Sequence, residues 1–224
     1  GALALYSNTT GSLNTASGAY SLYYNTAGNH NTAYGYQSLK FNTTGNDNTA
    51  FGYNSLSFNT TGSNNTAYGQ QSLLYNTTGI YNTASGAYSL GANTTGSNNT
   101  AYGIYSLLSN TTGSNNTAFG YSAKASTGNA TNQTVIGHEA TGQADNSVVL
   151  GNDNVTAVYM GEDSGATVYA GGLNLGGTAI TANAAELNYL DGVTSSIQTQ
   201  LDNAGGGAST LNDLTDVLVD SNSM

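Results

Sequence analysis

Asn59–Tyr75 reads NTTGSNNTAYGQQSLLY, and the same seventeen-residue phrase recurs from Asn8 to Ala125 without an insertion or a deletion. A fixed repeat this short is typical of a solenoid, in which each repeat forms one coil that stacks on the next. The sequence therefore predicts an all-β fold, a parallel β-solenoid of seven such coils. Each coil opens on an asparagine: Asn8, Asn25, Asn42, Asn59, Asn76, Asn93 and Asn110.

One coil divides into a strand, a second short run and a turn. Asn31–Gly35 is predicted to be a strand closed by glycine, with Thr and Tyr on one face and Ala on the other, because side chains alternate along a strand. Gln37–Leu39 is predicted to be a second extended run, and Asn42–Gly45 a turn in which Asn and Gly take positive φ. Stacking then places like residues over one another and buries an apolar face that no single coil could bury alone. The predicted ladders run through Asn31, Thr32, Ala33, Tyr34, Gly35, Leu39 and Gly45.

Aromatic residues occupy the last strand position of most coils, as at Tyr34. Where Ser17 and Ser85 stand in that position, an aromatic residue appears three residues later, at Tyr20 and Tyr88. Packing between coils or between chains is the favoured role, because aromatic side chains bury more area than any others. A row of exposed tyrosines that binds sugar is the alternative.

Composition excludes several classes of function. The chain has 224 residues with neither cysteine nor proline, and its net charge of −10 comes from the C-terminal part, since Asp47 is the only acidic residue before Glu139. Lys40 and Lys124 are the only basic residues, so the clustered cations that bind nucleic acid or anionic membranes are missing. No apolar run is long enough for membrane insertion. Because no signal peptide is visible and the chain begins on Gly1, we expect a piece of a longer protein.

A second sequence repeat, of different length, starts near Asn132. Thr134–Gly137 and Ser147–Gly151 are both β-prone and end on glycines fourteen residues apart. With Ala-x-Gly between them, these segments resemble the head repeat of trimeric autotransporter adhesins. The resemblance implies a left-handed parallel β-roll with three chains side by side around one axis. We therefore expect a seventeen-residue-repeat β-roll over residues 1–126 and a fourteen-residue-repeat β-roll over residues 127–151.

The C-terminal third of the chain has a different composition and lacks the repeats. Residues 152–180 are rich in Gly and are predicted to form short strands, as a cap or neck. Residues 181–203 are predicted to form a short α-helical coiled-coil neck capped by Asn183, and residues 204–224 a linker and the start of a further segment. The apolar seam of the coiled coil follows steps of three and four residues, with Thr194 as a polar member, at Leu187, Leu190, Ile197 and Leu201.

Two segments in this third give a biological context. Ile180–Gly192, followed by Leu211–Val217, resembles segments of bacteriophage tail-fibre and related virion proteins. The resemblance implies a place in a virion or at a cell surface, and the small coil together with the seam from Leu187 to Leu201 predicts a homotrimer. Its partner would be a host cell-surface glycan or protein.

No catalytic, cofactor or metal site is predicted. His30 and His138 lie in different repeat types, and no serine lies in a Gly-x-Ser-x-Gly turn. Gly161–Gly165 and Asp153–Asn154 could supply oxygen ligands to Ca²⁺, but a solvated acidic loop is the favoured interpretation. The repeats hold a single Asp, too few carboxylates for an enzyme that hydrolyses polysaccharide.

These features favour a structural fibre protein that is not an enzyme, the shaft or spacer of a trimeric phage tail fibre. The head domain of a bacterial trimeric surface adhesin is the alternative. An ice-binding solenoid is a weaker one, because the threonine column shares its face with tyrosines. That column is unbroken: Thr15, Thr32, Thr49, Thr66, Thr83, Thr100 and Thr117.

Overall fold

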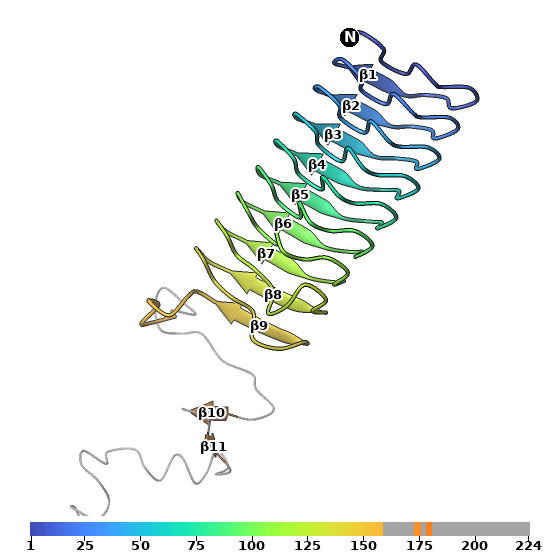
Figure 1. The fold of residues 1–224 in the computed structure, drawn as a ribbon. Coiled ribbons are helices and arrows are strands. Elements are labelled where there is room, and N and C mark those ends of the chain that lie inside the picture. Colours follow the sequence, from blue (N-terminus) through green and yellow to red (C-terminus); the bar gives the residue numbers. More distant parts are fainter. Residues whose placement is uncertain (159–172, 176–177, 181–224) are drawn as a thin grey trace, which may run out of the picture. The chain divides into compact units, whose positions relative to one another are not determined.

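The computed structural model describes residues 1–158, 173–175 and 178–180. Residues 1–158 fall in the first of two compact units and form a parallel β-solenoid, with nine strands joined in one sheet in sequence order (Figure 1). The predicted all-β parallel solenoid is therefore confirmed. The strands are β1 (Thr15–Ser17), β2 (Thr32–Tyr34), β3 (Thr49–Phe51), β4 (Thr66–Tyr68), β5 (Thr83–Ser85), β6 (Thr100–Tyr102), β7 (Thr117–Phe119), β8 (Gln133–Ile136) and β9 (Ser147–Leu150).

The register between strands follows the sequence repeat. Thr32 on β2 pairs with Thr49 on β3, and the same seventeen-residue offset holds as far as the pair of Thr117 with Thr134. Between β8 and β9 the offset falls to fourteen, because Thr134 pairs with Val148. The two repeat lengths therefore belong to one continuous sheet.

The apolar interior consists of two columns that run through the stacked coils. A fully buried leucine contributes roughly 1.5–3 kcal/mol, but one Leu and one Ala per coil make a core only when the coils stack. The predicted leucine and alanine ladders are present. Their buried members are Leu22, Leu39, Leu56, Leu73, Leu90 and Leu107, and Ala33, Ala50, Ala67, Ala84, Ala101 and Ala118.

Two buried asparagine ladders run beside these columns. In the first, the Nδ2 of Asn42 donates to the Oδ1 of Asn25 at 2.7 Å and to the carbonyl of Gly45 at 2.9 Å. In the second, the Nδ2 of Asn48 donates to the Oδ1 of Asn31 at 3.1 Å and to a backbone carbonyl of the next coil at 2.9 Å. A buried amide is costly unless it is hydrogen-bonded. The ladders meet this requirement by bonding each coil to its neighbours.

The second run of the coil is not extended, contrary to the prediction. Gln37 and Leu39 take left-handed conformations, with φ of 57° and 50°. The N–H groups of these two residues bond to opposite neighbouring coils: Gln37 donates to the carbonyl of Ala19 at 2.9 Å, and Leu39 to that of Ser55 at 3.1 Å. A left-handed leucine costs roughly 1–2 kcal/mol. Burial of its side chain and this hydrogen bond offset that cost.

The role predicted for the turn glycine is also wrong. Gly45 and Asn42 do not take positive φ; the strand-closing Gly35 does, with φ of 128°. Gly45 is needed for close approach instead. A Cβ at this position would overlap the carbonyl oxygen of Gly62 and the Oδ1 of Asn42, and it would lie 2.9 Å from the Nδ2 of Asn59. This glycine column lets the turn lie against the asparagine ladder.

The second unit contains the remaining described residues. β10 (Leu173–Leu175) and β11 (Thr178–Ile180) pair antiparallel, with Leu173 opposite Ile180. Short strands were predicted within residues 152–180, and these two lie there. The predicted coiled coil of residues 181–203 lies outside the described residues.

Candidate interaction surfaces

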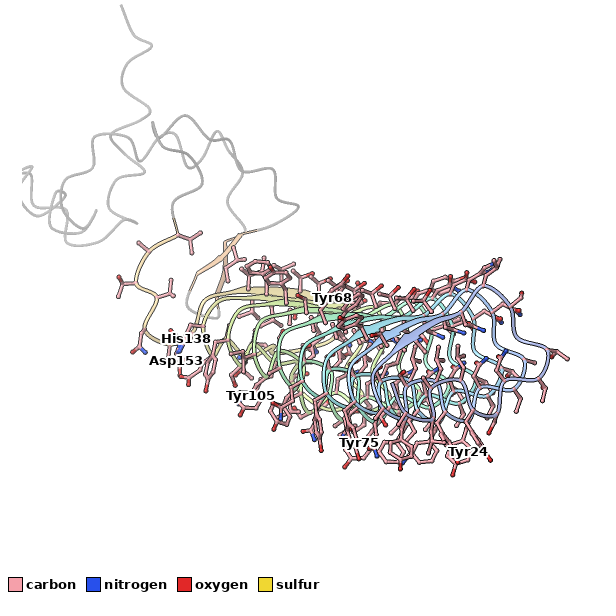
Figure 2. The ribbon with its side chains drawn as sticks, turned by 90° about the horizontal axis from the view of Figure 1, so that it is seen from above. Tyr24, Tyr68, Tyr75, Tyr105, His138 and Asp153 are labelled. Carbon is pink, nitrogen blue, oxygen red and sulfur yellow. The ribbon has the colours of Figure 1, made fainter. Side chains whose placement is uncertain are left out.

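The outward face of the sheet carries two parallel columns of side chains. On β2 the middle residue Ala33 is buried, while Thr32 and Tyr34 point outward, as the alternation predicts. Figure 2 shows Tyr68 on this side of the solenoid. We call the column of last strand residues the front ladder: Ser17, Tyr34, Phe51, Tyr68, Ser85, Tyr102, Phe119, Ile136 and Leu150.

The rings of the front ladder stack on one another and remain exposed. The ring centroids of Tyr34 and Phe51 lie 5.4 Å apart, those of Phe51 and Tyr68 lie 5.0 Å apart, and those of Tyr102 and Phe119 lie 4.9 Å apart. Tyr34, Tyr68 and Tyr102 are nevertheless 56%, 46% and 54% exposed. The rings thus pack between coils, as expected, and also leave an apolar surface exposed.

A second ring ladder was missed by the sequence analysis. The rings of Tyr24, Phe41, Phe58 and Tyr75, which we call the back ladder, stack with centroid distances of 5.2, 5.1 and 5.4 Å. Figure 2 shows Tyr24 and Tyr75 on the side of the solenoid away from Tyr68. The signal was present in the sequence, because each of these residues directly precedes the opening asparagine of a coil.

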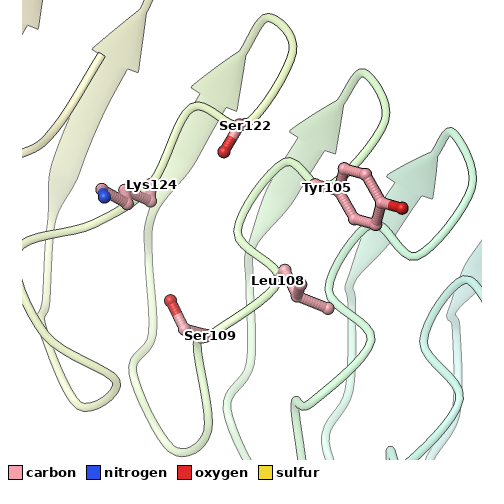
Figure 3. Close-up of a pocket in the computed structure, with 5 residues that line it drawn as sticks. All are labelled: Tyr105, Leu108, Ser109, Ser122 and Lys124. Carbon is pink, nitrogen blue, oxygen red and sulfur yellow. The ribbon is translucent and has the colours of Figure 1, made fainter. Parts of the chain in front are cut away.

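A cleft of about 350 Å³ lies beyond the end of the back ladder (Figure 3). In the column of the back ladder, Tyr75 is followed by Ala92 and Ser109, so the back ladder contributes no ring to the cleft. Besides Ser109, the cleft is lined by Tyr105, Leu108, Ser122 and Lys124. The lining offers one cation, an aromatic ring and hydroxyl groups, but no acid–base pair for catalysis.

The histidines and carboxylates are dispersed over the surface. The Nδ1 of His30 lies 3.4 Å from a carboxylate oxygen of Asp47, and both side chains are more than half exposed. The N–H of Thr131 donates to the Asp145 carboxylate at 2.8 Å and holds the pKa of that carboxyl below its usual value. Asp153 shares a small polar cleft with Glu139. Within the described residues, no three metal-binding side chains come together.

In the described ranges no helix is long and apolar enough to cross a membrane. The predicted ladder residues of neighbouring coils lie next to one another, as Thr32 does with Thr49 and Ala33 with Ala50. The predicted seam at Leu187, Leu190, Ile197 and Leu201 falls outside the described residues. Comparison with protein-family models, with curated proteins and with solved structures found no match to this chain.

Proposed function

We propose that this chain is the shaft, or spacer, of a trimeric virion fibre of the phage-tail type that serves host attachment. The supporting observation is that the same contacts repeat from coil to coil along β1–β7. In the first asparagine ladder, the bonds of Asn59 to Asn42 and of Asn76 to Asn59 measure 2.7 and 2.8 Å. A spacer needs length and stiffness, and each coil adds about 4.8 Å of length with its own set of hydrogen bonds.

The charge distribution supports a spacer. From Asn48 to Ala123 the chain has no Asp, Glu, Lys, Arg or His. An uncharged surface does not steer a charged partner toward it. We therefore place the main receptor recognition elsewhere in the full protein.

Association of three chains is part of the proposal. A single chain exposes rings on two sides, and soluble monomers rarely leave large contiguous apolar surfaces uncovered. The back ladder is unbroken from Tyr24 to Tyr75, so we place it toward the common axis, with the front ladder turned outward. The seam from Leu187 to Leu201 would hold the chains together as a neck.

Native mass spectrometry tests the trimer directly. We expect a species of three times 22.7 kDa, whereas a folded monomer would contradict the proposal.

Ile197→Asp should lower the thermal stability of the trimer, because it would bury an unpaired carboxylate in the seam. If that variant is as heat-stable as the parent trimer, the seam assignment is wrong.

Deletion of whole coils tests the spacer role. Removing Asn25–Phe58, two complete coils, should keep every ladder in register and shorten the rod by about 10 Å. Attachment of the particle or cell that carries the full-length protein should survive. Removing eight residues from Asn59–Tyr75 is the matched control, because it shifts the register of the stack and should prevent folding. Loss of attachment in a correctly trimeric coil deletion would contradict the spacer role.

The head domain of a bacterial trimeric adhesin is the second candidate, and the exposure of the front ladder favours it. In that case the coils themselves would contact the receptor, so the same two-coil deletion would weaken attachment. Ice binding is less well supported, because the outward threonines share their face with the rings of Tyr34, Tyr68 and Tyr102. Absence of thermal hysteresis would exclude it.

A further inference from the structure

The front ladder has one vacancy with a ring on both sides. Ser85 on β5 pairs in register with Tyr68 on β4 and with Tyr102 on β6. The far face of Tyr68 is covered by Phe51, with an angle of 2° between the ring planes, and the far face of Tyr102 is covered by Phe119, at 6°. The two faces directed toward Ser85 stack on no other ring of the described chain. We call this position the ring gap at Ser85.

The ring gap has the width of one ring. Adjacent strands lie about 4.8 Å apart, so the rings of Tyr68 and Tyr102, two strands apart, are separated by roughly 10 Å. One ring-to-ring step in this ladder takes 4.9 to 5.4 Å. A single further six-membered ring can therefore contact both aromatic faces, above the small half-buried side chain of Ser85.

We infer that the ring gap at Ser85 binds one pyranose ring of a neutral sugar. The two faces of a pyranose are rich in C–H groups and can pack on the aromatic rings, while its hydroxyls project from the rim. Outward threonines border the gap in the adjacent column: Thr66 is half-buried, and Thr83 and Thr100 are exposed. Their hydroxyls can donate to and accept from sugar hydroxyls. Apolar walls with a few polar groups at the edge are the usual composition of a small-ligand site.

The surroundings favour a neutral sugar over other occupants. Because no charged side chain occurs from Asn48 to Ala123, an acidic sugar or a charged peptide would lose hydration without gaining a counter-ion. The ring ladders of a second copy fit poorly, because their rings come in rows about 5 Å apart and the gap admits only one ring. The site does not depend on the spacer role. Its affinity is expected to be low per chain and to rise through multivalency in an assembly.

The substitution Ser85→Tyr tests the site, because it fills the gap with the residue that β2, β4 and β6 carry in the same column. Ser17→Tyr is the matched control, since it makes the same change in the same column outside the gap. Binding of lactose, cellobiose and maltose to the full chain would be measured by saturation-transfer NMR and titration. We expect the parent and Ser17→Tyr to bind at least one of these sugars equally, and Ser85→Tyr to bind none.

A second variant keeps the test decisive if Ser85→Tyr folds poorly. Tyr102→Ser removes one wall of the gap and should weaken sugar binding about tenfold. Failure of the parent chain to bind any of the three disaccharides would overturn the inference, as would unchanged binding by Ser85→Tyr. A change of oligomeric mass in Ser85→Tyr without a change in sugar binding would show that the gap is a contact between chains. None of these outcomes decides the spacer role, which the deletion of Asn25–Phe58 tests with Ser85 still in place.

Discussion

The asparagine ladders inside the coils and the ring ladders outside them come from the same repeat, yet the residue types at equivalent positions vary much less in the first than in the second. The opening asparagine is identical in every coil from Asn8 to Asn110. In contrast, the front ladder holds Tyr, Phe, Ser, Ile and Leu. An asparagine in the ladder donates to one neighbouring coil and to a turn carbonyl, and accepts from the other coil; no other side chain of that size offers two donor hydrogens beside an acceptor oxygen. A ring on the surface only needs an apolar neighbour. For these two kinds of ladder, invariance accompanies buried hydrogen bonding, and variation accompanies exposure.

The largest effect is expected from Asn59→Asp. Asn59 donates to the Oδ1 of Asn42 at 2.7 Å and to the carbonyl of Gly62 at 2.8 Å, and a carboxylate can donate to neither. The variant would bury an unpaired charge, so we expect a loss of about 4 kcal/mol in the free energy of unfolding at neutral pH, measured by urea denaturation. At acidic pH the protonated carboxyl can donate again, and part of the loss should be recovered.

The control for this variant is Asn64→Asp. Asn64 is exposed, and Asp47 occupies the same position one coil earlier. Its effect should be within the error of the measurement. Equal losses in both variants would show that the cost arises from added negative charge and not from the ladder.

A smaller but still large effect is expected from Gly45→Ala. The added Cβ would meet the backbone of Gly62 and the Asn42 side chain, which cannot move without disturbing the ladder, so we expect a loss of about 3 kcal/mol. Gly91→Ala is the comparison, because other coils carry Ser57 and Leu74 in that column. It should lower the urea midpoint only slightly. A Gly45→Ala variant as stable as the parent would mean that the turn does not require close approach.

The smallest effect is expected from Phe51→Ser on the outside of the third strand. Its coil neighbour Leu56 is fully buried, so Leu56→Ala should cost about 3 kcal/mol. Phe51→Ser should cost about 1 kcal/mol or less, because Ser17 and Ser85 already occupy this column. Thermal denaturation of the two variants gives the comparison. If Phe51→Ser is as damaging as Leu56→Ala, the front ladder is part of the core of an assembly and not a free surface.

The sequence by itself determined the period, the strand and the identity of the inner ladders. A seventeen-residue offset brings Ala33 over Ala50 in any regular stack, because parallel strands pair in register when each coil has the same length. The alternation of Thr32, Ala33 and Tyr34 then decides which residues face inward. Both inferences rest on spacing alone, and spacing is visible in a sequence.

The tertiary structure alone decided the backbone conformation of the second run and of the turn, and which rings stack on one another. Leu39 is left-handed because its N–H must reach the carbonyl of Ser55 in the next coil while its side chain stays buried, and no local propensity favours that conformation. Gly45 is required by atoms of Asn42 and Gly62 that approach it only in the stack. The ring gap at Ser85 likewise exists only because its neighbours in space are residues seventeen positions away. Contacts between coils, and not preferences within one coil, set these features.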